Sequence, residues 1–132
     1  GLWKAILMQK NLKNKEMPDK LEFGLEELRI SNNRSNSIGY DTLIKIFPNL
    51  KRLYAGNTRA SREDFINIVK GFKKLELLDV TNCSNIGQMD ENLNELKEAL
   101  SGSSIRKLFI TDLGPKTISY LEKCHIEVVN KW

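Results

Sequence analysis

Four copies of one short apolar string recur along the 132-residue chain, and their spacing constrains the fold more than any other feature. The strings are LEELRI from Leu25, LKRLYA from Leu50, LELLDV from Leu75 and IRKLFI from Ile105, so their starts lie 25, 25 and 30 residues apart. Self-similarity at such a period is typical of a solenoid, in which each unit buries its apolar side only against its neighbours. The spacing therefore predicts a repeat architecture.

Each string has the alternation of a short strand with one buried face. In the third copy, for example, Leu78 and Val80 alternate with Leu77 and Asp79. We therefore expect one strand from each unit. The equivalent apolar residues are Leu25, Leu28 and Ile30; Leu50, Leu53 and Ala55; Leu75, Leu78 and Val80; and Ile105, Leu108 and Ile110.

Between the strings the apolar period lengthens to about 3.6 residues, which predicts helices. Ser61 and Asp64 form a candidate capping pair at the start of one helix, whose apolar residues are Phe65, Ile66, Val69 and Phe72. The same pattern predicts a helix that ends before Pro48, one that begins at Asp90, and a shorter one over residues 115–121. After these, Ile126 and Val128 predict a last, irregular strand that closes the stack.

A turn position follows each predicted strand, five residues after its second apolar residue. Asn33, Thr58 and Cys83 occupy it in the first three units. Small polar side chains there can satisfy backbone groups of the turn. Leu113 departs from this pattern in the fourth unit.

These residues resemble the leucine-rich repeat family. The third unit, LELLDVTNCSNIGQMDENLNEL, is most similar to the cysteine-containing subclass of F-box and ribonuclease-inhibitor-like proteins. In that subclass a Cys follows the strand, an Ile comes three residues later and a Leu opens the helix, which match Cys83, Ile86 and Leu93. The resemblance covers residues 25–128. It implies an α/β solenoid of about four repeats over residues 25–132, with a curved parallel sheet on the concave side and helices on the convex side.

Residues 1–24 interrupt the period, and terminal units of a solenoid are usually atypical. Leu2, Ile6 and Leu7 follow a helical spacing, which predicts an N-terminal helix and linker that cap the repeats. The segment LWKAIL is also similar to the sequence that often follows an F-box.

Composition and charge limit the classes of function. No run approaches the roughly 18 apolar residues of a membrane span, so we expect no membrane partner. Residues 1–20 contain five Lys against Glu16 and Asp19, which leaves 16 basic and 15 acidic residues elsewhere and argues against nucleic acid as a partner. Two cysteines do not make a disulfide framework, which favours an intracellular location in cytoplasm or nucleus, or an organelle if a targeting segment was removed.

No catalytic constellation can be recognised in the sequence. His125 is the only histidine, and no Ser-His-acid group, Cys-His group, metal-ligand cluster or glycine-rich phosphate loop is present. We therefore expect neither an enzyme nor a cofactor or metal site.

The strand residues between the buried positions are expected to point to the concave side. There they would form three rows: Glu27, Arg52, Leu77 and Lys107; Arg29, Tyr54, Asp79 and Phe109; and Ser31, Gly56, Thr81 and Thr111. Aromatic residues and Arg are enriched where protein surfaces meet, although aromatics also favour strands for structural reasons. The predicted protein-binding residues are Arg29, Arg52, Tyr54, Leu77, Asp79, Lys107 and Phe109.

The sequence thus indicates a noncatalytic protein-binding module that is part of a larger chain or complex. The family resemblance implies the substrate-recognition repeats of an F-box-type ubiquitin ligase receptor. The alternatives are a structural scaffold or assembly-factor subunit, including a small organellar assembly protein, and a pathogen effector with leucine-rich repeats.

Overall fold

The computed structural model describes residues 24–32 and 39–130. The predicted turn residue Asn33 and, apart from Gly24, the predicted N-terminal capping segment lie outside these ranges. Gly24 itself is exposed and lies in a turn.

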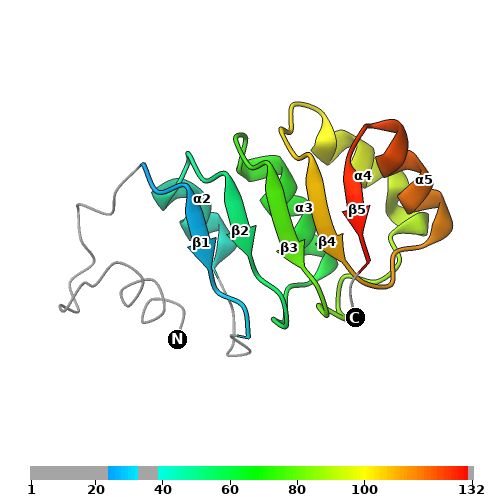
Figure 1. Ribbon diagram of the computed structural model, residues 1–132, viewed down its shortest axis with the longest axis horizontal. Coiled ribbons are helices and arrows are strands. Elements are labelled where there is room, and N and C mark those ends of the chain that lie inside the picture. Colours follow the sequence, from blue (N-terminus) through cyan, green and yellow to red (C-terminus); the bar gives the residue numbers. More distant parts are fainter. Residues whose placement is uncertain (1–23, 33–38, 131–132) are drawn as a thin grey trace.

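Five short strands form one parallel sheet in the order in which they occur along the chain (Figure 1). The four repeated strings supply β1 (Glu27–Arg29), β2 (Arg52–Tyr54), β3 (Leu77–Val80) and β4 (Lys107–Ile110). The last strand is β5 (Glu127–Val129), where the sequence predicts an irregular strand. It pairs with β4 without a break in register, with Leu108 opposite Val128.

Four α-helices connect the strands; in the view of Figure 1, α2, α3 and α4 lie behind the sheet and α5 lies beside β5 at its end. They are α2 (Tyr40–Ile46), α3 (Arg62–Gly71), α4 (Leu93–Leu100) and α5 (Pro115–Lys123). The predicted cap of α3 is confirmed. The Ser61 hydroxyl accepts from the Asp64 amide at 3.1 Å, and the Asp64 carboxylate accepts from the Ser61 amide at 3.0 Å.

The third helix begins differently from the prediction. Asp90 starts a single 3-10 turn, η1 (Asp90–Asn92), and the α-helix follows only from Leu93. Met89 precedes this turn with a left-handed backbone, at φ 69°. The side chain of Asp90 does not cap its own helix, because it is bonded to α5, as described below.

The core lies between the sheet and the helices. Strand pairing places four leucines opposite one another across neighbouring strands, and all four are buried: Leu28, Leu53, Leu78 and Leu108. Burying such a side chain stabilises a fold by roughly 1.5–3 kcal/mol. Alternate strand residues remain partly exposed on the other face, so the predicted alternation is confirmed. This is an α/β fold, and its arrangement is compatible with a solenoid.

Candidate functional site

The face of the sheet opposite the helices, here called the open face, presents two rows of side chains. Because the strands pair in register, residues far apart in sequence become neighbours across the sheet. The first row is Glu27, Arg52, Leu77, Lys107 and Glu127, and the second row is Arg29, Tyr54, Asp79, Phe109 and Val129. The open face therefore brings together all seven predicted binding residues, and β5 extends both rows by one member.

The predicted third row behaves differently, because it lies beyond the ends of all four strands. Ser31 is exposed and Thr81 is half-buried, but Gly56 and Thr111 are buried. The Thr111 hydroxyl accepts a hydrogen bond from the Asn82 amide at 3.1 Å. The third row is therefore interrupted by buried members and does not extend the open face.

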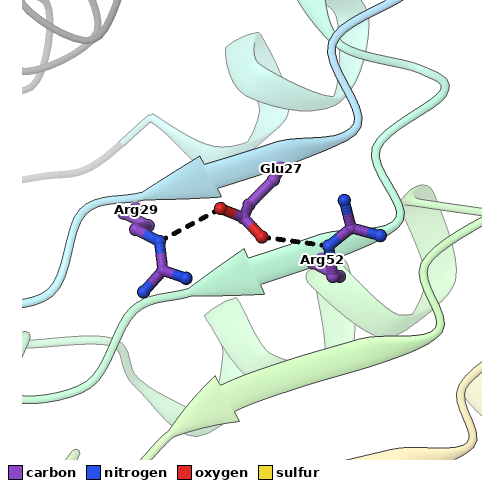
Figure 2. A network of polar contacts seen from close by, with 3 residues as sticks. All are labelled: Glu27, Arg29 and Arg52. Atoms are coloured by element: carbon purple, nitrogen blue, oxygen red, sulfur yellow. Dashed lines mark hydrogen bonds and ion pairs between the residues drawn. The ribbon is translucent and has the colours of Figure 1, made fainter.

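Glu27 lies between two guanidinium groups at the β1 end of the open face (Figure 2). Its two carboxylate oxygens accept from Nε of Arg52 at 3.0 Å and from Nε of Arg29 at 3.1 Å. These two hydrogen bonds, Arg52 first, lower the pKa of Glu27 below its ordinary value. Exposed ion pairs contribute little to stability, so these contacts describe how the three charges are arranged at this end of the open face and add little free energy to the fold.

Two aromatic rings of the second row have a cation beside them. The guanidinium carbon of Arg29 lies 4.1 Å from the centre of the Tyr54 ring, and Nζ of Lys107 lies 5.2 Å from that of Phe109. Lys107 also pairs with Glu127 at 3.5 Å. Both rings are half-buried, so part of each remains accessible on the open face. Contact with the cations restricts the orientation of these side chains.

Asp79 occupies the second row between Tyr54 and Phe109. Its Oδ1 accepts from the amide of Thr81 at 2.9 Å and from the Thr81 hydroxyl at 2.7 Å. Within the part of the chain that the structure describes, Oδ2 has no hydrogen-bond partner. A fixed carboxylate with one oxygen available is suited to accept a hydrogen bond from a partner.

The charges of the two rows cancel. Three basic residues, Arg29, Arg52 and Lys107, face three acidic residues, Glu27, Asp79 and Glu127. Such a mixed surface is unlike the basic stripe that follows a phosphate backbone. Among the described residues, no group of three or more His, Cys, Asp or Glu side chains is placed to hold a metal ion. His125 is exposed in the turn between α5 and β5, with φ 61°.

Two of the three turn positions that the structure describes, Thr58 and Cys83, lie side by side in the interior. The Thr58 hydroxyl donates to the carbonyl of Ala55 at 2.8 Å, and Cys83 Sγ lies 3.2 Å from the same oxygen. The hydroxyl and the thiol are 3.4 Å apart. They therefore share one backbone carbonyl between two units. Leu113, at the equivalent place, packs against the core instead.

Sequence reasoning missed a second set of turn residues, one position earlier. Asn32, Asn57, Asn82 and Asp112 all have a left-handed backbone, with φ between 55° and 64°. Asn and Asp adopt this conformation more readily than other residues with a side chain. The side-chain nitrogen Nδ2 of Asn57 also donates a hydrogen bond to the side-chain oxygen Oδ1 of Asn32 at 2.9 Å. The signal was visible in the sequence, since an Asn or Asp occupies this position in all four units.

No protein-family model, curated protein or solved structure matches this chain. In residues 24–32 and 39–130, no helix has the length and apolar character needed to cross a bilayer.

Proposed function

We propose that this chain is a noncatalytic protein-binding module of the leucine-rich repeat type, which holds its partner on the open face. The observation that carries the proposal is the second row, where two accessible aromatic rings flank the fixed carboxylate of Asp79. Aromatic and Arg side chains dominate the energy of protein interfaces.

The chemistry of the open face favours protein over other classes of partner. Its charges cancel, so it lacks the excess of positive charge that draws in nucleic acid. Leu77 lies between Arg52 and Lys107 in the first row and adds an apolar contact at the middle of the face. A mixture of apolar centre and paired charges is typical of non-obligate protein interfaces.

Contacts among these side chains, which restrict their mobility, also favour binding. Arg29, Arg52 and Lys107 each have a carboxylate partner, and two of them contact an aromatic ring. Side chains that are already restricted lose less conformational entropy when a partner arrives. The open face is therefore a largely preformed surface.

The finer proposal is that the chain forms the substrate-recognition part of an F-box-type ubiquitin ligase receptor in the cell interior. It is supported by the similarity of the third unit to cysteine-containing repeats and by that of LWKAIL to the segment that follows an F-box. Affinity capture of the full-length protein, followed by mass spectrometry, tests it. Recovery of a ligase adaptor would support the receptor, whereas a fixed set of subunits without an adaptor would favour the scaffold alternative.

A double variant tests the open face itself. Tyr54→Ala/Phe109→Ala should weaken binding of the captured partner by about 2 kcal/mol or more, because it removes both aromatic anchors. Lys45→Ala/Lys70→Ala, which changes exposed residues on the helices, is the matched control. Thermal melts should show that both variants stay folded. Full affinity in the folded aromatic variant would exclude the open face as the binding site.

A further inference from the structure

The helical layer opens between its last two helices. α2 packs against α3 and α3 against α4, whereas α5 packs mainly on β5 and the short helix η1 and has fewer contacts with α4. The change coincides with the longer spacing, 30 residues, between the third and fourth strings. The extra residues form the loop and 3-10 turn that precede α4.

Two adjoining cavities fill the space between α4 and α5, and together we call them the α4–α5 groove. The outer cavity has a volume of about 420 Å³ and the inner one about 270 Å³. They share Lys97 and Tyr120, and Nζ of Lys97 lies 5.0 Å from the centre of the Tyr120 ring. The two cavities therefore adjoin at this pair of side chains.

Both cavities combine apolar and polar side chains. The outer cavity presents more apolar than polar surface, with Leu93, Pro115 and Tyr120 beside Lys97, Lys116 and Lys123. The inner cavity has Leu100, Ile105 and Ile126 in its wall, but both isoleucines are buried and its surface is about equally polar and apolar. Among the described residues that line either cavity, none is acidic. A ligand that complements this groove therefore combines apolar groups with negative charge.

We propose that the α4–α5 groove is a second docking site, which binds an acidic peptide segment of a partner protein. An aliphatic or aromatic side chain of the segment packs against the apolar lining of the groove, and its Asp or Glu residues contact the lysines at the outer cavity. The site lies on the helical side of the sheet, so it is separate from the open face and does not rest on the function proposed for that face.

Two other occupants match the groove less well. The N-terminal segment of this chain, residues 1–20, contains five Lys against two acidic residues, so the lysines of the groove would repel it. A nucleic acid would satisfy the lysines but has no aliphatic side chain for the apolar lining of the groove. An acidic peptide satisfies both parts.

Selection from a random dodecapeptide phage library, with the full chain as target, tests the proposal. We expect enriched peptides that combine acidic residues with an aliphatic or aromatic residue. Lys97→Glu and Lys123→Glu should each weaken their binding by about tenfold, since each replaces an attraction by a repulsion. Lys70→Glu on α3 makes the same charge change outside the groove and should have little effect.

Cys124 provides an independent readout of where the peptides bind. It is exposed and lines the inner cavity, whereas Cys83, the other cysteine of the sequence, is buried. A saturating amount of a selected peptide should slow the reaction of Cys124 with a disulfide reagent by about tenfold, because access controls that reaction. Tyr54→Ala/Phe109→Ala should not change this protection.

Three results would overturn the second site. One is a selection that yields no binder or only peptides without acidic residues. Another is binding that Lys97→Glu leaves unchanged in a protein that melts normally. The third is protection of Cys124 by a single-stranded oligonucleotide but not by the peptides, which would identify nucleic acid as the ligand.

Discussion

Asp90 caps a helix that begins 25 residues after it. Its Oδ1 accepts from the amide of Thr117 at 2.9 Å and from the Thr117 hydroxyl at 2.8 Å. Gly114, at the N-cap of α5, has no side chain that could accept these hydrogen bonds. A Cβ at that position would overlap the Asp90 carboxylate. One unit of the chain therefore supplies the cap of the next.

The first prediction is that Asp90→Ala lowers the melting temperature and weakens the dependence of stability on pH. Burial alone would raise the pKa of Asp90, but the hydrogen bonds from Thr117 and the positive charge of Lys116 lower it overall, below the ordinary value of 3.8. The charged form is thus favoured in the folded protein. The charged Asp90 carboxylate therefore adds to the stability of the fold. This added stability is fully present above pH 3.8 and is lost as the pH falls through the pKa of Asp90 in the folded protein.

Thermal melts of wild type and Asp90→Ala between neutral and strongly acidic pH measure this effect. The two melting temperatures should converge on the acidic side. Glu91→Ala, at an exposed neighbouring residue, is the control. A gap between Asp90→Ala and wild type that persists unchanged into strong acid would mean that the charge of Asp90 does not contribute.

The second prediction compares two adjacent leucines of β3. Leu78 is fully buried, so Leu78→Ala should reduce the free energy of unfolding by about 2–5 kcal/mol. Leu77 is half-buried on the open face, and Leu77→Ala should cost less than about 1 kcal/mol. Urea unfolding measures both. Similar losses for the two variants would show that the register of β3 is wrong.

The third prediction concerns the left-handed turn at Asn82, where φ is 58°. Asn82→Ala should lower the free energy of unfolding by about 1 kcal/mol, because a Cβ is disfavoured in this conformation and Ala lacks the adaptable side chain of Asn. Asn82→Gly should be more stable than Asn82→Ala, since Gly adopts positive φ readily. Chemical denaturation measures which of the two variants is more stable. A more stable Asn82→Ala would contradict the left-handed backbone.

The fourth prediction concerns Glu27. An NMR titration should give its carboxylate a pKa below the ordinary value of 4.5. Arg52→Gln should raise that pKa more than Arg29→Gln, because the hydrogen bond from Arg52 lowers it most. Equal pKa values in wild type and both variants would mean that the contacts of Figure 2 do not persist in solution.

The sequence was sufficient to predict the strands, the register and the two rows of the open face, whereas the predicted third row lies beyond the strand ends. The reason is that each unit repeats the same local pattern, so one alignment of the four strings places Tyr54 beside Asp79 and Asp79 beside Phe109. The cap of α3 was also predictable, because Ser61 and Asp64 are three residues apart. Local patterns and short-range spacing carry this information.

Contacts between side chains and helices of different units could not be predicted in this way. Asp90 looks like the start of its own helix, and only the folded chain brings it to Thr117. Likewise, the α4–α5 groove depends on how α4 and α5 are placed relative to each other in the folded chain. Neither relationship leaves a periodic signal, because each occurs once.

The register of the sheet has a consequence for any attempt to imitate the open face. Its second row takes one residue from each strand, at positions 29, 54, 79, 109 and 129. A short synthetic peptide copied from any one stretch of the chain therefore contains a single member of that row. Under the proposed function, such peptides should compete poorly for a partner of the open face, and antibodies raised against them should not recognise the surface as a whole. Only the folded sheet presents it.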